Sequence, residues 1–474
     1  MAVDVPNNPV PLWIDNQPVR SSLKFPVVNS GNGNATSACG ATADIVSQAI
    51  ESSHRAFRRD LLLNAARLLS ERSDAVRAIL EVETPVDAFI KDLNIGVAID
   101  QLQELASHVL EATTSTVQPS KLDRGGLIMT VKEPIGVQLA IAPWNAALLL
   151  AMRAVATPIA CGNTVILKAS EMSPLVHHFF GELFRDAGFP PGVLNIVQHS
   201  RQDAAVIVDA LVSDDRVRKV NFTGSTAVGR IVAAKAAQYG KPVLLELGGK
   251  CCQAVLADAD LDKAAQAAAF GAFAHICMST ERIIVGETVM DEFSAKLATI
   301  VRQATSHSGG ASVANTSKVA TLVTDAVAQG ATLLLGGSTT SLQNGSSLAP
   351  QILTNVTRDM DIWRTETFGP VAVLVGFRTV EEAIQMANDS EYGLSASIFT
   401  RDTAKALHIA RLLNSGAVHI NSTTIHDEAH APHGGSKASG WGRFGVPWGF
   451  AEFTQLKTIT IPSYAGGCLR FHER

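Results

Sequence analysis

Short apolar segments alternate with segments of helical spacing along most of this chain, and that alternation limits the folds open to it. Apolar residues recur at helical spacing in residues 61–69 and 183–187. Continuous apolar runs, typical of strands in parallel sheets, occupy residues 165–167, 193–197, 243–245 and 371–375. The pattern predicts a doubly wound α/β fold.

The length predicts more than one lobe. At 474 residues the chain is about twice the size at which a single hydrophobic core usually stops growing, so two or three lobes are expected. Residues 114–122 look like a polar connector, and residues 336–347, rich in Gly, Ser and Thr, like an exposed loop.

Charge and cysteine content exclude some classes of protein. The formal net charge of -5 provides no electrostatic footprint for nucleic acid. The six cysteines lack zinc-finger spacing, and the adjacent Cys251 and Cys252 are unsuited to a disulfide. A reducing, cytosolic compartment is the simpler interpretation. Residues 1–9 carry Asp4 and Pro6 where a secretory signal needs a basic start and an apolar run.

One stretch has the length of a membrane span. Residues 134–152 form a run of 19 residues without a charge. However, Gln138 and the central Pro143-Trp144-Asn145 argue against a lipid environment. We interpret the stretch as a buried strand, a tight loop that carries chemistry, and a helix.

Cys277 and Glu246 form the pair that says most about function. Glu246 precedes Cys277 by 31 positions. A thiolate adds to an electrophilic carbon, and a carboxylate within reach can take a proton from the thiol or from an attacking water. Alone the pair is weak evidence, because most cysteines are packed as small inert side chains.

Four further motifs accompany this pair in a fixed order. They are Ile141-Ala142-Pro143-Trp144-Asn145, Val165-Ile166-Leu167-Lys168-Ala169-Ser170-Glu171, Asn221-Phe222-Thr223-Gly224-Ser225-Thr226-Ala227-Val228-Gly229 and Glu366-Thr367-Phe368-Gly369-Pro370. Together the six motifs resemble the NAD(P)-dependent aldehyde dehydrogenase superfamily. Residues 145–154 look like its salicylaldehyde, vanillin and benzaldehyde dehydrogenase branch, and residues 276–285 look fungal.

The resemblance implies a three-part organisation. It places a Rossmann-like, NAD-binding domain at residues 1–119 and 136–245, and an α/β catalytic domain at residues 246–440. Residues 120–135 and 441–474 would form a small β segment for oligomerisation. A homodimer or homotetramer in the cytoplasm follows as an expectation.

The cofactor site is expected on two strand-to-helix turns. Gly224 and Gly229 flank a helix start whose amides face a pyrophosphate, with Ser225 adding a hydroxyl. Lys168 and Glu171 match the positions that hold the adenosine ribose, and a carboxylate there repels a 2′-phosphate, which favours NAD over NADP. By resemblance, three further residues contact the cofactor: Trp144, Glu366 and Phe368.

The same resemblance implies a covalent mechanism. Cys277 attacks the aldehyde carbon, and the Asn145 amide with the Cys277 backbone N–H stabilises the oxyanion. Glu246 then activates the water that hydrolyses the thioester. Relatives that transfer the acyl group to coenzyme A do not keep a glutamate in this role, so the free acid is the expected product.

Two residues are candidate substrate contacts. Arg153 would bond a ring hydroxyl or carbonyl of an aromatic aldehyde, or instead pair with a carboxylate and never touch substrate. His426 lies in a segment expected to be a loop at the substrate mouth. The spacing of His426 and His430 suggests a zinc helix, but Asp427 stands where that motif requires glutamate, and we reject metal. His177 and His178 are interpreted as surface residues.

Some segments depart from the family pattern. About three residues are missing before Cys277, where the chain reads Ala274-His275-Ile276-Cys277, and it also looks clipped near residues 57–59 and 306–311. These departures leave a second hypothesis: a nucleotide-binding relative without activity and with a structural or regulatory role. The aldehyde itself stays open between aromatic catabolism and secondary-metabolite biosynthesis.

Overall fold

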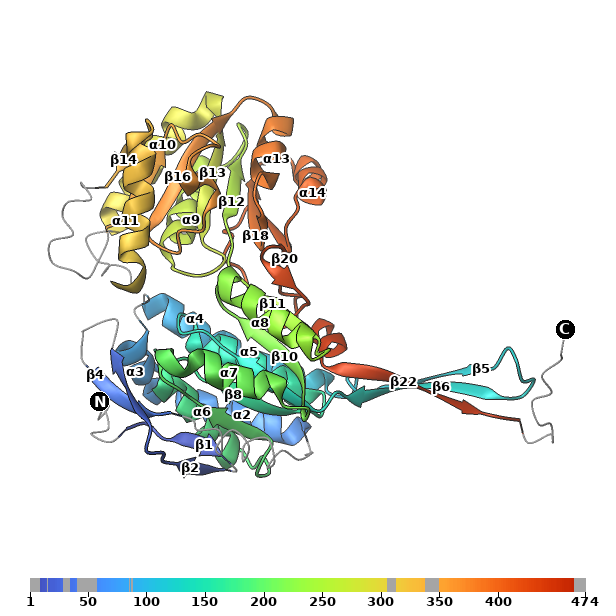
Figure 1. Cartoon of the computed structure of the whole chain (residues 1–474). Helices are drawn as coiled ribbons and strands as arrows, with labels where there is room; N and C mark the ends of the chain where they lie inside the picture. Colours follow the sequence, from blue (N-terminus) through green and yellow to red (C-terminus); the bar gives the residue numbers. More distant parts are fainter. Residues whose placement is uncertain are drawn as a thin grey trace.

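The computed structural model describes residues 9–14, 16–28, 35–40, 58–84, 86, 88–304, 313–336 and 349–463. Two lobes, each built on one large sheet, lie one above the other, and a thin β arm projects from the side of the lower lobe (Figure 1). The expected loop beyond residue 336 and the clipped segment at 306–311 fall outside these ranges.

The first sheet has eight strands, and its five central strands are parallel. Its order is β2 (Gln17–Val19), β1 (Leu12–Ile14), β9 (Leu194–Val197), β8 (Thr164–Lys168), β7 (Val137–Ile141), β10 (Val217–Thr223), β11 (Val243–Glu246) and β21 (Gly440–Trp441).

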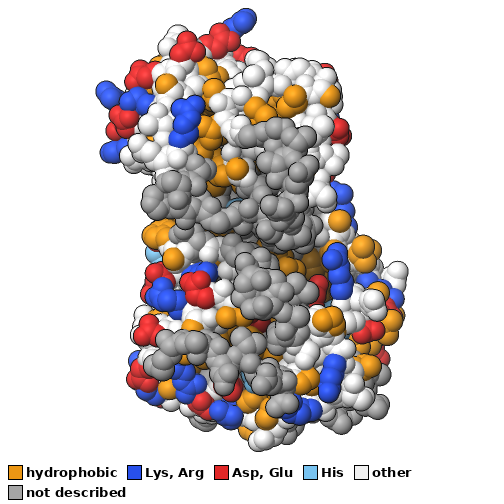
Figure 2. Space-filling view, turned by 90° about the vertical axis from the view of Figure 1, so that its left-hand side faces the viewer, with side chains coloured by type: hydrophobic (Ala, Val, Ile, Leu, Met, Phe, Trp, Pro, Cys, Tyr) orange, Lys and Arg blue, Asp and Glu red, His pale blue; other side chains and the backbone are white. Residues whose placement is uncertain are grey.

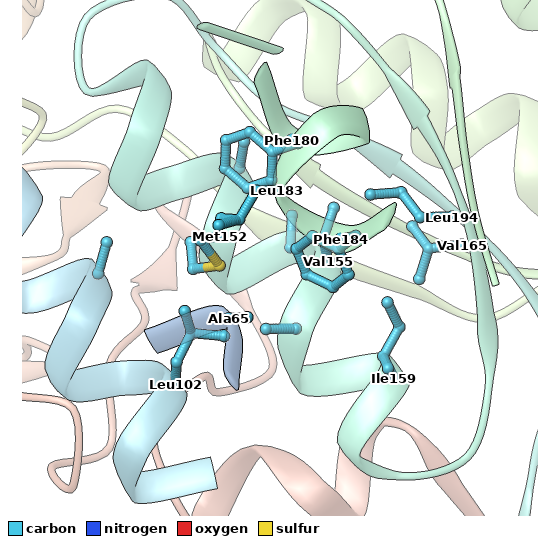
Figure 3. Packing of buried hydrophobic residues seen from close by; sticks show 14 of the residues in the cluster. Ala65, Leu102, Met152, Val155, Ile159, Val165, Phe180, Leu183, Phe184 and Leu194 are labelled. Carbon is cyan, nitrogen blue, oxygen red and sulfur yellow. The ribbon is translucent and has the colours of Figure 1, made fainter. Parts of the chain in front are cut away.

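Helices cover both faces of this sheet. One face carries α2 (Arg59–Glu71), α3 (Ser73–Glu83), α4 (Ala88–His108), α5 (Ala147–Ala160) and α6 (Pro174–Asp186), and the other α7 (Ala204–Ser213) and α8 (Thr226–Gln238). Along β8, Val165 and Leu167 belong to one core cluster and Ile166 to the other, because successive strand residues point to opposite faces. Figure 3 shows the first cluster, where Leu102, Met152 and Phe184 lie among its packed side chains.

The second sheet has seven strands, all in parallel pairs except for β14. Its order is β14 (Thr332–Leu335), β15 (Gln351–Thr354), β16 (Val371–Phe377), β13 (Thr280–Gly286), β12 (Cys251–Val255), β18 (Ser395–Phe399) and β19 (Ala417–Ile420). The helices of this lobe are α9 (Leu261–Phe273), α10 (Met290–Ala304), α11 (Val313–Ala328), α12 (Asp361–Arg364), α13 (Val380–Asn388) and α14 (Thr403–Leu412).

The arm is a three-stranded antiparallel sheet, β22 (Thr454–Ile461), β6 (Leu127–Pro134) and β5 (Thr116–Pro119). Two short ladders complete the described strands: β3 (Lys24–Val28) with β4 (Ala35–Cys39), and β17 (Tyr392–Gly393) with β20 (Ser436–Lys437). The connector expected at residues 114–122 was therefore partly wrong, because it contains β5, a strand of four residues whose side chains are all exposed.

The predicted core elements are confirmed. Each of the four apolar runs lies in a strand with parallel neighbours, in β8, β9, β11 and β16, and the uncharged stretch folds into β7, a loop and α5. Among the described residues, no helix has the length and apolarity required to cross a bilayer. On the face in Figure 2, acidic and basic side chains are interspersed over both lobes.

The interpretation of His177 as a surface residue was wrong. His177 is fully buried, and its Nδ1 accepts the backbone N–H of Ser170 at 2.9 Å. Burial, reinforced by the charge of Lys168, lowers the pKa of His177 to about 3. The residue is therefore a neutral acceptor that stabilises the turn after β8, which carries Lys168 and Glu171.

Candidate active site

The chain passes from the first sheet to the second through a short segment that holds several predicted site residues together. Glu246 is the last residue of β11, and Gly248 and Gly249 follow before β12 begins. A Cβ on Gly248 would lie 2.2 Å from Glu366 Oε2, and one on Gly249 would lie 2.8 Å from the Cys277 carbonyl oxygen. Glycine is therefore required here for the backbone to approach both residues closely.

Glu246 lies inside a network of charged side chains. His433 Nε2 is 2.7 Å from Glu246 Oε1, and Arg153 Nη1 is 3.5 Å from Glu246 Oε2. Asp427 joins both partners, because it pairs with Arg153 Nη2 and its Oδ1 lies 3.5 Å from His433 Nδ1. Four side chains from three separate segments thus form one network, which contains the buried carboxylate of Glu246.

This network determines the acidity of Glu246. Burial alone would raise the pKa of this carboxyl, but the positive charges of His433 and Arg153, with their hydrogen bonds, outweigh burial and lower it to about 2. Asp427 is buried too, and Arg153 and His433 likewise lower its pKa. Both carboxylates are therefore ionised at neutral pH.

The loop that carries Cys277 is short but well anchored. Its backbone turns at His275, which has a left-handed φ of 55°. Ser279 fixes the turn on both sides, since its hydroxyl accepts the Ile276 N–H at 3.0 Å and its N–H donates to the Ile276 carbonyl at 2.9 Å. The Thr424 hydroxyl donates to the Met278 carbonyl at 2.7 Å. The segment before Cys277 is therefore a compact, hydrogen-bonded turn.

Cys277 has mainly apolar and acidic surroundings. The residue is partly exposed and packs against a small cluster that contains Ile90, Ile276 and Ile425. Burial of the thiol raises its pKa well above the ordinary value, and Glu246, Cys251 and Glu366 raise it further, while Arg153 opposes them. In this state Cys277 is a thiol at neutral pH.

Trp144 and Asn145 lie at the start of α5, in the turn that follows β7. Asn145 is only 5% exposed, and the Trp144 ring meets the Phe368 ring edge to face at a centroid distance of 6.4 Å. The structure thus brings Trp144 and Phe368 together, as expected for two residues assigned to one cofactor.

Glu281 positions the segment that carries Glu366 and Phe368. This buried carboxylate accepts the N–H groups of Thr367 and Phe368 and pairs with Lys250 at 2.6 Å. It holds Phe368 in a left-handed conformation, with φ of 46°. Glu366 Oε1 accepts the Gly249 N–H at 2.9 Å, and burial, with the nearby charge of Glu281, raises the pKa of Glu366 to about 7.

The adenosine end of the predicted cofactor site is also assembled. Lys168 ends β8, and its Nζ lies 3.5 Å from Glu171 Oε2. Burial lowers the pKa of Lys168, although Glu171 opposes the shift. Burial would raise the pKa of Glu171, but Lys168 lowers it below the ordinary value. An ionised carboxylate and a lysine are thus available for ribose hydroxyls.

The turn at Gly224 has the form expected of a phosphate cradle. Ser225 is the N-cap of α8, and its Oγ accepts the Val228 N–H at 3.4 Å. A Cβ on Gly229 would lie 2.4 Å from Leu247 Cδ2, so glycine lets α8 pack closely against the residue that follows Glu246. The first turn of α8 and the Lys168–Glu171 pair thus offer groups of the kinds that bind a phosphate and ribose hydroxyls.

The two candidate substrate contacts differ in their surroundings. Arg153 is 4% exposed and paired with two carboxylates, which is the ion-pair alternative stated for it. His426 is exposed and lies 2.7 Å from Glu428 Oε1. Residues 426–430 form no helix, so the expected loop is confirmed.

Sequence reasoning missed two members of the site. Asp427 entered only as a mismatch to a zinc motif, and His433 was not considered. His433 directly follows Pro432 and precedes Gly434-Gly435. This Pro-His-Gly-Gly sequence was visible, but it does not show that His433 pairs with Glu246, 187 positions away, because that contact depends on the tertiary fold.

Comparisons with known proteins identify related chains. The profile described as "Aldehyde dehydrogenase family" matches residues 17–459. A vanillin dehydrogenase of Pseudomonas fluorescens is 43% identical over 95% of this chain and 98% of its own length. A benzaldehyde dehydrogenase [NAD(+)] of Pseudomonas putida is 35% identical, covering 92% of each. The crystal structure of a salicylaldehyde dehydrogenase from Pseudomonas putida, complexed with salicylaldehyde, superposes with a TM-score of 0.91 at 35% identity, covering 97% of this chain and 99% of that one.

Proposed function

The chain belongs to the aldehyde dehydrogenase family, and from that premise we propose that it oxidises aromatic aldehydes to carboxylic acids with NAD. The observation that carries the proposal is the single segment that brings Glu246, Cys277 and Glu366 together through Gly248 and Gly249. Relatives that act on vanillin, salicylaldehyde and benzaldehyde support the aromatic substrate. The comparisons do not favour the alternative of an inactive nucleotide-binding relative.

In the proposed mechanism Cys277 is the nucleophile. Its sulfur bonds to the aldehyde carbon, and the Asn145 amide with the Cys277 backbone N–H donates to the resulting oxyanion. NAD, when bound, would supply the hydride acceptor. Loss of the hydride from the carbon bonded to sulfur leaves a thioester on Cys277. Glu246 then takes a proton from the water that releases the acid. Because the resting thiol has a raised pKa, its proton must leave before the attack.

The cofactor residues are proposed from the two assembled ends of the site. Lys168 and Glu171 would hold the adenosine ribose, and Gly224, Ser225 and Gly229 would face the pyrophosphate. At the other end Trp144, Glu366 and Phe368 would hold the nicotinamide half. The ionised Glu171 would repel a 2′-phosphate, which favours NAD over NADP.

His426 remains a proposed substrate contact, since it is exposed beside Asp427. Arg153 remains a proposed substrate contact only if the substrate displaces one of its two carboxylate partners. Its observed pairing supports a different role, in which Arg153 holds Glu246 and Asp427 and compensates their negative charge. We also propose that the enzyme acts in aromatic catabolism or in secondary-metabolite biosynthesis.

We also propose the division into an NAD-binding domain, a catalytic domain and an oligomerisation segment. The arm of β5, β6 and β22 supports a homodimer or homotetramer, because Leu456, Ile459 and Ile461 are exposed along its outer strand. A cytoplasmic location is proposed because the five described cysteines are free thiols.

Purified protein with NAD and a panel of vanillin, salicylaldehyde, benzaldehyde and hexanal tests the proposal, with NADH formation as the readout. We expect turnover of the aromatic aldehydes, and little of hexanal. Binding of NAD without turnover of any aldehyde would contradict it and would return the chain to the inactive alternative.

A further inference from the structure

A cavity of about 240 Å³ lies beside the charged network of the active site. Its walls are formed by one face of α4 and by the loop at residues 427–430. A cavity of about 150 Å³ is large enough to hold benzene. This cavity therefore has room for a substituted aromatic ring.

Asp427 connects the cavity to the catalytic groups. It lines the cavity and pairs with Arg153 Nη2. Arg153 Nη1 in turn lies 3.5 Å from Glu246 Oε2. The wall of the cavity is thus linked to Glu246 through a single side chain, that of Arg153.

The helix α4 connects the same cavity to Cys277. Ile90, near the start of this helix, belongs to the apolar cluster that packs against Cys277. Val97 follows Ile90 by seven residues and lines the cavity. Seven residues are about two helical turns, so both side chains lie on one face of α4, about 10 Å apart. A substrate whose aldehyde carbon meets Cys277 would extend its far end towards this cavity.

The cavity is lined by negative charge. Four carboxylates line it, those of Asp100 and Glu104 on α4 and those of Asp427 and Glu428 on the loop. No lysine or arginine lines it among the residues that the structure describes. Arg153 pairs with Asp427 but is shared with Glu246, so one positive charge faces two negative charges there.

The ion-pair partners of the outer two carboxylates are histidines. His108 Nε2 lies 3.5 Å from Glu104 Oε2, and His430 Nε2 lies 3.2 Å from Glu428 Oε2. His426 Nε2 lies 2.7 Å from the other oxygen of Glu428. A histidine offsets the charge of a carboxylate only while its ring is protonated.

We propose that this cavity selects substrates by charge: it admits neutral or cationic aromatic aldehydes and disfavours aldehydes that carry a carboxylate. This inference rests on the proposed function and specifies the substrate class of the same site. A carboxylate on the far side of the ring would approach Asp100, Glu104 and Glu428, and like charges that line a cleft repel it. The acid formed in the reaction is repelled by the same groups, which favours its release.

Para-substituted benzaldehydes separate charge from shape. 4-Formylbenzoate and 4-formylbenzamide are nearly equal in shape and differ by one charge. kcat/KM for each is measured with NAD at about pH 9, where an imidazole is neutral. The variants are Asp100→Asn and Glu104→Gln, which each remove one charge and keep the size of the side chain. Glu71→Gln is the matched control, because Glu71 is exposed on α2 and pairs with Arg67.

The wild type is expected to prefer the amide to the carboxylate. Asp100→Asn and Glu104→Gln should each raise kcat/KM for 4-formylbenzoate about 3- to 10-fold, the effect of removing one nearby like charge. Neither variant should change kcat/KM for the amide, and Glu71→Gln should change neither value. The preference of the wild type should decrease as the ionic strength rises from about 0.01 M to about 0.5 M, because the Debye length shortens.

Charge selection can also be measured without turnover. Iodoacetate and iodoacetamide alkylate a thiol by the same chemistry and differ by one charge. Their rates at Cys277, measured by peptide mass spectrometry without NAD, should favour iodoacetamide in the wild type. Asp100→Asn and Glu104→Gln should shift the ratio towards iodoacetate about 2- to 5-fold, and Glu71→Gln should leave it unchanged.

Equal kcat/KM for the two aldehydes in the wild type, or a preference that both variants leave unchanged, would overturn the proposal. A parallel change in both aldehydes would overturn it as well, because it would show an effect of shape and not of charge. If no aldehyde forms NADH but the alkylation ratio shifts as expected, the proposed function fails and the charge selection is supported. An unshifted alkylation ratio contradicts the charge selection even in an enzyme that oxidises benzaldehyde.

Discussion

The two sides of the active site differ in acidity: the pKa of Glu246 is lowered, and the pKa of Cys277 is raised. On the Glu246 side, His433, Arg153 and Asp427 surround a carboxylate with compensating charge, and its pKa falls to about 2. On the Cys277 side, apolar neighbours and nearby negative groups raise the pKa of the thiol. Removal from water acts in the same direction on both groups, so the difference arises from their partners. Transfer of a proton from Cys277 to Glu246 is therefore uphill at rest, and substrate, cofactor or a proton relay has to reduce the difference.

The most severe test removes the thiol side altogether. Cys277→Ala lacks the nucleophile, so aldehyde oxidation should fall by at least about 10⁴-fold, measured as NADH formation. The matched control is Cys251→Ala, because Cys251 is the neighbouring buried thiol whose Sγ lies 3.7 Å from the Cys277 carbonyl. Near-wild-type activity in Cys277→Ala would end the covalent account.

Removing the carboxylate side should affect both residues of the comparison. Glu246→Gln is expected to slow thioester hydrolysis about 10²- to 10⁴-fold. The same change removes a negative charge that raises the pKa of Cys277, so alkylation of Cys277 by iodoacetamide should begin at lower pH than in the wild type. An unchanged alkylation profile would show that the two groups are not coupled electrostatically.

Asn145→Ala should impair catalysis without changing the thiol. Loss of one oxyanion donor costs about 3 to 4 kcal/mol of barrier, or about 10²- to 10³-fold in kcat. The rate at which iodoacetamide alkylates Cys277 should stay the same, because Asn145 acts on the oxyanion and not on the thiol. A parallel fall in alkylation would assign Asn145 to positioning Cys277.

The smallest effect concerns stability in acid. The pKa of Glu246 is depressed from 4.5 to about 2 in the folded protein. Its contribution is present above pH 4.5 and is lost as the pH falls towards 2, on the order of 3 kcal/mol at about 1.4 kcal/mol per unit. Glu246→Gln should flatten the fall of the free energy of unfolding over this window. Glu428 is an exposed acid on the loop that carries Asp427, and Glu428→Gln is the control that should keep the wild-type slope.

The sheet cores were predictable because their signal is local. The runs that became β8, β9, β11 and β16 are continuous and apolar, and such runs are buried wherever the sheets form. His177 was misjudged for the converse reason. Its neighbours along α6 do not show that the turn after β8 packs over the ring and donates the Ser170 N–H to it.

The site residues differ in the same way: some were predictable from local sequence, and others depend on tertiary contacts. Cys277, Glu246, Lys168 and Glu171 stand in motifs that a sequence displays, and the structure brings each pair together or into one electrostatic network. His433 and Asp427 were out of reach, because their roles depend on contacts with residues 187 and 274 positions away. The charge that determines the state of Glu246 is therefore a property of the tertiary fold.

The central claim is that Cys277 carries the acyl group and that Glu246 activates the water that releases it. The direct measurement is peptide mass spectrometry of Glu246→Gln after one turnover of vanillin with NAD. The account predicts a vanilloyl adduct on the peptide that contains Cys277, and none on the peptide that contains Cys251 and Cys252. Formation of NADH with no adduct, or with an adduct on another cysteine, would contradict it.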